Sequence, residues 1–209
     1  ILQMIKLPSS FSPAVVCVLV SLTAGNQARY FFLDGNMNLV AQNSISLTGV
    51  PMGRPTMAVT DDNHLVIASP GNSGAGVVPS LLVFSSAGTS PQSSYTWTGN
   101  CDTMLVANVG GRIALFDNTG SLRVYTTSSS TSGYSLLLNE TLTAGARSVY
   151  AVANLNAYNF ILGANQGNYF TRVVSSGASL RSTDKLYNYQ APGQGVGTYY
   201  GSLSYALLG

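Results

Sequence analysis

The chain has 209 residues, of which 8% are charged and 45% are hydrophobic, and its formal net charge is +2. This length suits one well-buried domain, and the hydrophobic fraction is too high for a disordered chain. The basic residues are scattered singly between Lys6 and Lys185, which excludes the basic stripe expected of a protein that binds nucleic acid. No apolar run approaches the ~20 residues of a membrane helix, so we expect no membrane insertion.

Strand-like runs recur along the chain with a spacing of about 45 residues, each run leading through a polar turn into a second one. The first runs are Ala14–Val20, Thr56–Val59, Thr103–Ala107 and Ser148–Ala153. The second runs are Tyr30–Leu33, Leu65–Ala68, Arg112–Phe116 and Tyr158–Leu162. No sustained helical period is present, and a repeat of this length built from strands is typical of a β-propeller.

The repeat predicts an all-β fold with small antiparallel blades near residues 14–54, 55–100, 101–146 and 147–186. We expect the two ends of the chain, residues 1–13 and 187–209, to pair in a fifth blade that closes the ring. Such a closure leaves no open sheet edge. A β-sandwich of the jelly-roll type is the alternative fold, and an exchanged arm is the alternative role of the C-terminal segment.

One repeat resembles a known type of propeller unit. A proline precedes the apolar strand Thr56–Val59, an Asp-rich turn leads to Leu65–Ser69, and a third strand runs through Phe84 to Gly88. This stretch, from Pro55 to Gly88, is similar to the NHL-type repeat, and the other three units share mainly its strand rhythm. The resemblance implies a structural unit that occurs in binding scaffolds and in lyases, so it implies no activity.

Residues that could carry chemistry are few. His64 is the only histidine, and we interpret the turn Asp61–His64 as solvated because its neighbouring side chains cannot converge on one metal ion. Acidic residues fall in predicted turns, where they cap the backbone. The glycine-rich segments 71–76 and 193–197 precede no helix and are interpreted as flexible loops. We therefore expect no cofactor, no metal site and no enzymatic activity.

The two cysteines do not form a disulfide framework. Cys17 lies inside an apolar strand and is interpreted as a small buried hydrophobe. Cys101 lies in a polar turn and is expected to be exposed. A Cys17–Cys101 disulfide is a further possibility in an oxidising compartment, although the repeat places the two residues in blades that are not neighbours.

Candidate interaction residues are mainly aromatic. Tyrosines crowd the C-terminal segment among small polar residues, a composition suited to binding by contact area, and Tyr95 with Trp97 forms a second candidate platform. The C-terminal candidates are Tyr187, Tyr189, Tyr199 and Tyr200. The alternative is that all these rings fill gaps between blades. Asn139-Glu140-Thr141 is a sequon for N-glycosylation, which we expect in a turn between strands.

The low fraction of charged residues indicates where the protein acts and how it interacts. Ordinary soluble domains carry ~25% charged residues, and a surface of hydroxyls and amides suits an extracellular or surface-associated protein better. Low charge also removes the repulsion that keeps proteins apart. We expect a non-enzymatic structural or interaction module that forms a homo-oligomer or joins a larger extracellular assembly. The alternatives are a lectin-like propeller that binds glycans and a viral shell or fibre protein.

Overall fold

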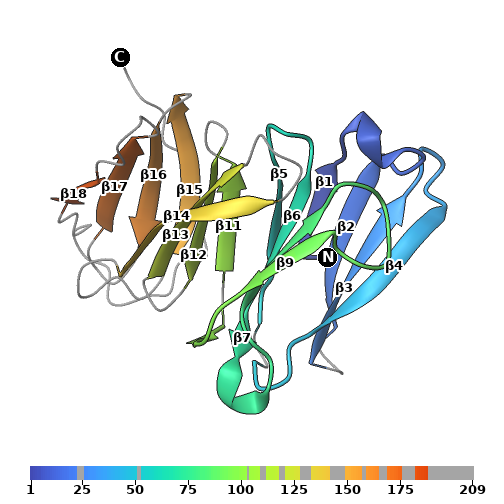
Figure 1. Cartoon of the computed structure of the whole chain (residues 1–209), viewed down its shortest axis with the longest axis horizontal. Helices are drawn as coiled ribbons and strands as arrows, with labels where there is room; N and C mark the ends of the chain where they lie inside the picture. The colour runs from blue at the N-terminus through green and yellow to red at the C-terminus, as the bar shows by residue number, and fades with distance from the viewer. Residues whose placement is uncertain are drawn as a thin grey trace, which may run out of the picture.

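The computed structural model contains four antiparallel sheets of four strands each (Figure 1). It describes residues 1–22, 26–50, 53–102, 104–108, 112–117, 121–127, 133–141, 149–156, 159–164, 169–175 and 182–187. Within every sheet the strands follow one another in chain order. In the second sheet, the connection between the second and third strands contributes one strand to a separate two-stranded ribbon. The helices of the described part are two 3₁₀ turns, η1 (Ser9–Phe11) and η2 (Ser73–Ala75).

We call the sheets blades one to four. Blade one contains β1 (Gln3–Lys6), β2 (Val16–Leu22), β3 (Gln27–Leu33) and β4 (Leu39–Ser46). Blade two contains β5 (Thr56–Val59), β6 (Leu65–Ser69), β8 (Ser80–Phe84) and β9 (Ser93–Thr96). Blade three contains β11 (Met104–Asn108), β12 (Arg112–Asp117), β13 (Ser121–Thr127) and β14 (Tyr134–Thr141). Blade four contains β15 (Val149–Asn156), β16 (Asn159–Ala164), β17 (Tyr169–Ser175) and β18 (Ser182–Tyr187).

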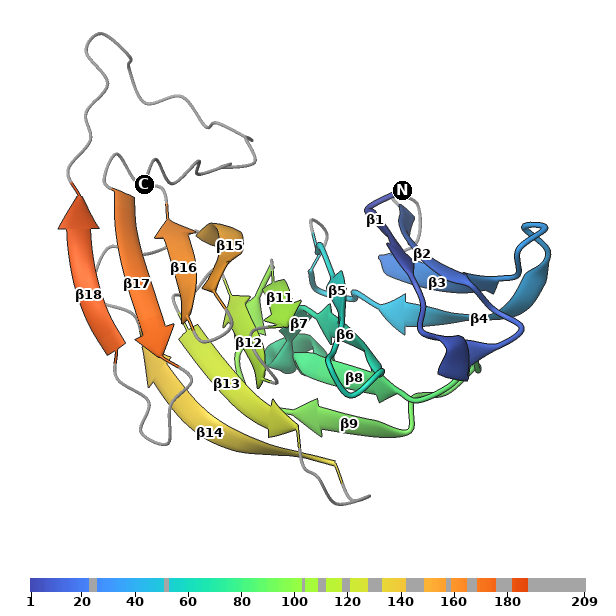
Figure 2. The same ribbon diagram turned by 90° about the horizontal axis from the view of Figure 1, so that it is seen from above.

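The blades stand side by side in an arc, as consecutive blades of a β-propeller do (Figure 2). The first strand of each blade lies on the inside of the arc, where β1 contacts β5 and β11 contacts both β5 and β15. Blade one and blade four are the two ends of the arc. The sheets are separate four-stranded meanders, and this topology differs from the two face-packed sheets of a jelly roll.

The N-terminal segment has a different role from the one the sequence predicts. Residues 3–6 form β1, which pairs with β2 in the register Gln3↔Leu19 to Lys6↔Val16. Blade one therefore begins at Gln3 and already has four strands, so the N-terminal segment does not belong to a fifth blade. The physical reason is that β2 follows β1 closely in the chain. One edge of β2 pairs with β3, and its other edge offers unpaired backbone N–H and C=O groups to β1. Residues 188–209, assigned to the same closing blade, lie outside the described residues.

Local turn chemistry accounts for the hairpin between β3 and β4. Asp34 Oδ1 accepts hydrogen bonds from the backbone N–H groups of Asn36 and Asn38, both at 2.8 Å. The Asn38 side chain also donates to this carboxylate, and these bonds lower the pKa of Asp34. The turn residue in the left-handed region is Met37, with φ of 65°.

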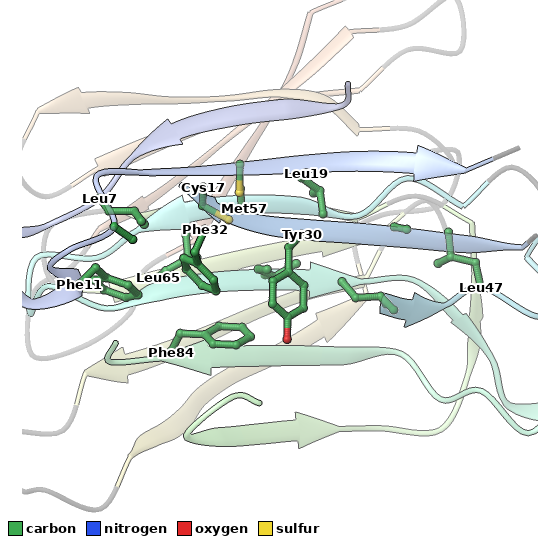
Figure 3. Packing of buried hydrophobic residues seen from close by; sticks show 14 residues of the cluster. Leu7, Phe11, Cys17, Leu19, Tyr30, Phe32, Leu47, Met57, Leu65 and Phe84 are labelled. Carbon is green, nitrogen blue, oxygen red and sulfur yellow. The ribbon is translucent and has the colours of Figure 1, made fainter. Parts of the chain in front are cut away.

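Blades one and two share an aromatic core (Figure 3). The Phe32 ring lies 5.9 Å from that of Phe11, 5.7 Å from that of Tyr30 and 5.8 Å from that of Phe84, measured between centroids. Tyr30 also donates from its hydroxyl to the carbonyl of Thr89 at 2.8 Å. All four rings are almost fully buried. The cluster joins β3 of one blade to β8 of the next.

Blade two is buried on both faces because it lies between two other blades. The β6 residues Leu65 and Ile67 pack in the core shared with blade one, whereas Val66 and Ala68 pack in the core shared with blade three. Successive residues of a strand belong to opposite faces, so a strand covered on both sides is apolar throughout. Every residue of β6 is buried.

Polar side chains also link the inner strands of neighbouring blades. The Gln3 amide donates to the Met57 carbonyl at 2.7 Å and accepts from the Met57 N–H at 2.8 Å. Thr56 makes the corresponding link one blade further, because its hydroxyl donates to the Met104 carbonyl at 3.0 Å and accepts from the Val106 N–H at 3.1 Å. Gln3 and Thr56 are each the first residue of an inner strand. They supply partners to backbone groups that no neighbouring strand reaches.

Candidate functional site

The only histidine lies in a turn where three blades meet. The turn of residues 60–64 joins β5 to β6, and its Asn63 carbonyl accepts a hydrogen bond from the Ser10 hydroxyl of blade one at 3.4 Å. Asn108 of blade three donates to Asp61 Oδ1 at 2.6 Å. The turn closes on itself because Thr60 N–H donates to the His64 carbonyl at 2.9 Å. It thus contacts both neighbouring blades.

Asp62 is the centre of the polar cluster in this turn. Its Oδ1 accepts hydrogen bonds from the Thr60 hydroxyl and, at 3.3 Å, from the Tyr134 hydroxyl. Its Oδ2 lies 3.1 Å from His64 Nδ1. The His64 ring meets the Tyr134 ring edge-on, with centroids 6.0 Å apart. Burial raises the pKa of Tyr134, so its hydroxyl remains a donor.

The turn expected to be solvated is partly so: Asp61 and Asn63 are exposed, whereas Asp62 and His64 are half-buried. Thr60 and Tyr134 are buried, and the side chains of His64 and Asp62 are only 26% and 30% exposed. Asp62 Oδ1 accepts from Thr60 of the turn and from Tyr134 of blade three, so the arrangement holds the turn against blade three. Among the described residues, no group of three or more His, Cys, Asp or Glu side chains is placed to hold a metal ion. Sequence reasoning missed Tyr134 as a member of this cluster, because it lies in the next repeat, 72 positions after Asp62.

The candidate platform of Tyr95 and Trp97 lies between blades two and three. The Tyr95 hydroxyl accepts from the Tyr134 N–H at 2.5 Å, and its ring packs 5.6 Å from that of Tyr125. The Arg123 guanidinium covers the Trp97 ring at 4.4 Å from the centroid. Both aromatic residues pack partly buried against the core shared by these blades. The structure therefore places them as gap-filling rings, the alternative that the sequence left open.

Both cysteines are free and buried, in two different cores. No disulfide joins Cys17 to Cys101, because blade two separates the two cores. The expected exposure of Cys101 is also wrong: it forms the ribbon strand β10 (Asn100–Cys101), which pairs with β7 (Gly71–Asn72). Burial raises the pKa of Cys17 to about 12 and that of Cys101 to about 11, so both remain thiols at neutral pH.

The same ribbon changes the interpretation of the first glycine-rich segment. Gly71 starts β7, and a Cβ atom there would lie 2.5 Å from the backbone nitrogen of Pro79. Asn72 caps η2 by accepting from the Ala75 N–H at 3.3 Å, and the Ser73 hydroxyl donates to the Gly99 carbonyl at 2.8 Å. The segment is therefore a hydrogen-bonded connection, in contrast to the expected flexible loop. The segment 193–197 lies outside the described residues.

The remaining sequence candidates are placed as follows. Asn139 is exposed on β14, the outer strand of blade three, so it lies in a strand instead of the expected turn. Tyr187 is the last residue of β18. Tyr189, Tyr199 and Tyr200 lie outside the described residues.

The outer face of blade one carries several apolar side chains, of which Met4 is exposed. We define it as the face turned away from blade two. Its central cross-strand row is Met4, Val18 and Phe31, given by the registers Met4↔Val18 and Val18↔Phe31. Met4 is 61% exposed and Phe31 is partly exposed, whereas Val18 is screened by its neighbours. Large exposed apolar patches mark interaction sites.

The rows on either side of this centre are mixed. One contains Val16 and Leu33 next to the exposed Lys6, and the other contains Val20 next to the exposed Arg29. Farther from the arc's inside, β4 contributes the exposed Gln42 and other polar residues. The outer face therefore has an apolar centre near the inside of the arc and a polar margin. This distribution is typical of a protein interface.

In the part of the chain that the structure describes, no helix has the length and hydropathy needed to cross a membrane. No protein-family model matches the sequence. No curated protein is similar to it. Among solved structures, the chain is similar to the WD40 domain of SCAP from fission yeast, with 9% identity and a TM-score of 0.49. The match covers 90% of this chain and 45% of that one, so the chain spans less than half of that structure.

Proposed function

We propose that this protein is a non-enzymatic interaction module that assembles with itself or within a larger complex at an extracellular or cell-surface location. The observation that carries the proposal is the apolar outer face of blade one, with Met4 61% exposed at its centre. Exposing such a face costs free energy in water, at ~25 cal/mol for each Å² of apolar surface. A chain with 8% charged residues also has little electrostatic repulsion to oppose association.

The proposal includes closure of the propeller. The four blades form an open arc in Figure 2, and the outer faces of its end blades are the surfaces that a closed ring would bury. Closure by both termini within a fifth blade has lost support, because β1 already belongs to blade one. If assembly with other chains closes the ring, it buries the apolar outer face of blade one and needs no fifth blade formed by the termini.

The oligomeric state tests this proposal. We expect the purified 21.8 kDa chain to have a larger mass in light scattering coupled to size-exclusion chromatography, with dissociation on dilution. The larger species should persist in 1 M salt (roughly a 3 Å screening length), because an apolar interface is not screened. A monomer at all accessible concentrations, with native β-sheet circular dichroism, would contradict the proposal.

We also propose that Asn139 carries an N-linked glycan when the chain is secreted. Its side chain is exposed on the outer strand of blade three, away from the inside of the arc. Expression through a eukaryotic secretory pathway should give a larger mass that an N-glycosidase removes. The Asn139→Gln variant should lack this shift, and an unshifted wild-type band would count against both the glycan and the extracellular assignment.

A further inference from the structure

The outer strands of blades one to three have open edges that differ in composition. β4, β9 and β14 each end their sheet, and no strand of the described part of the chain pairs with their outer edges. The exposed centre of β4 is polar (residues 42–44), and β9 contains three hydroxyl residues and a tyrosine. β14 instead exposes two consecutive leucines, Leu136 at 50% and Leu137 at 43%. An open edge with apolar side chains is a template for pairing with another chain.

The asparagine of the sequon lies on the same strand and on the same face as one of these leucines. Asn139 is paired with Arg123, and Leu136 is paired with Tyr125. Cross-strand partners share a face of a sheet, and both β13 residues belong to the face that packs against blade two. Residues 136 and 139 share this face because the pairing shifts by one residue at Leu137, as in a β-bulge. Their partners are two residues apart on β13, so the two side chains leave the strand about 7 Å apart.

We infer that the N-linked glycan on Asn139 caps the open edge of β14, covering Leu136 and excluding another chain from this edge. This inference rests on the glycan proposed above and gives it a role. Open edges are otherwise protected by lysine, by proline, by a bulge or by a covering segment. β14 has the bulge but contains no lysine and no proline. A glycan is bulky and solubilising, and its attachment point lies beside the exposed leucine.

The chain that the cap excludes is a second copy presenting the same edge. Two β14 strands that pair antiparallel are related by a two-fold axis, so each copy contributes the same residues to the contact. Such a pair would join two copies of blade three into one continuous sheet and would bring their exposed leucines together. The cap leaves the outer face of blade one free for the proposed assembly, because that face is turned away from blades two and three.

Variants of the sequon test the cap in protein secreted from eukaryotic cells. Asn139→Gln and Thr141→Ala both remove the acceptor sequence, whereas Thr141→Ser changes the same position and keeps it. We expect the two unglycosylated variants to have a self-association constant about tenfold above that of the glycosylated wild type, because two apolar edges become able to pair. Thr141→Ser should match the wild type. Sedimentation velocity over a concentration series measures all four proteins.

A second pair of matched variants locates the added association. Leu136 is 50% exposed on β14, and Leu39 is 52% exposed on β4, the outer strand of blade one. Adding Leu136→Thr to Asn139→Gln should return the association constant to the wild-type value. Adding Leu39→Thr to Asn139→Gln should leave the increase in place, because that leucine belongs to a different edge.

The outcomes separate the cap from the glycan itself. A secreted wild type without a glycan overturns both. A glycosylated wild type whose unglycosylated variants associate no more strongly overturns the cap and leaves the glycan intact. An increase that Leu136→Thr does not reverse, or that Leu39→Thr reverses equally, also overturns the cap. Circular dichroism checks that each variant is folded, and if either Asn139→Gln or Thr141→Ala is not, the other replaces it in both comparisons.

Discussion

Replacing Phe32 with alanine should lower the free energy of unfolding by about 3–5 kcal/mol, the usual range for deleting a buried aromatic side chain. Phe32 is completely buried, and its ring contacts those of Phe11, Tyr30 and Phe84 within 6 Å between centroids. The substitution therefore removes the ring that connects three others. It also leaves a cavity between blades one and two, where rigid sheets cannot collapse to fill it.

Urea unfolding followed by circular dichroism measures this loss as a lower midpoint with a similar slope. Tyr30→Phe is the control within the same cluster, because it keeps the ring and removes the hydroxyl that donates to the Thr89 carbonyl. That control should cost about 1 kcal/mol, the net contribution of a typical hydrogen bond. Equal losses for the two variants would show that Phe32 is not central to the core between the blades.

The strands were predictable because their signals are local. Short apolar runs separated by polar turns predict the strands β5 and β6 within a residue or two, and the Asp34 turn follows from side-chain chemistry that acts over four residues. The position of β1 was not predictable in this way. Its pattern identifies a strand, but only the three-dimensional arrangement determines that its partner is β2 and not a strand from the other end of the chain.

The polar cluster at the three-blade junction shows a second limit. The sequence identifies the turn around His64 and suggests that it is solvated, because polar residues are usually exposed. Asp61 and Asn63 are exposed, and the partial burial of Asp62 and His64 involves Tyr134, which lies in another repeat and donates to Asp62 across 72 positions of sequence. Similarly, Cys101 lies in a polar stretch and is buried by pairing with β7. Both differences from expectation arise where residues distant in sequence cover one another.

A buried ion pair lies within blade three, at the turn where the sequence predicts that Asp117 caps the backbone. Asp117 Oδ2 lies 3.2 Å from Arg123 Nη1, and the side chains are only 4% and 12% exposed. The same carboxylate accepts from the Ser121 N–H at 3.1 Å, and the guanidinium covers the Trp97 ring of the neighbouring blade. The pair thus fixes the β12–β13 turn and at the same time packs against blade two.

Replacing Arg123 with methionine should therefore destabilise the protein by about 3–5 kcal/mol, because it removes the cation that is paired with the buried Asp117 carboxylate. The effect should depend on that carboxylate. In the double variant Arg123→Met with Asp117→Asn, the uncompensated charge is absent and most of the lost stability should return. Chemical unfolding of the wild type, the two single variants and the double variant gives the coupling between the residues. Strictly additive losses, or a loss below about 1 kcal/mol for Arg123→Met, would indicate an exposed and weakly coupled pair.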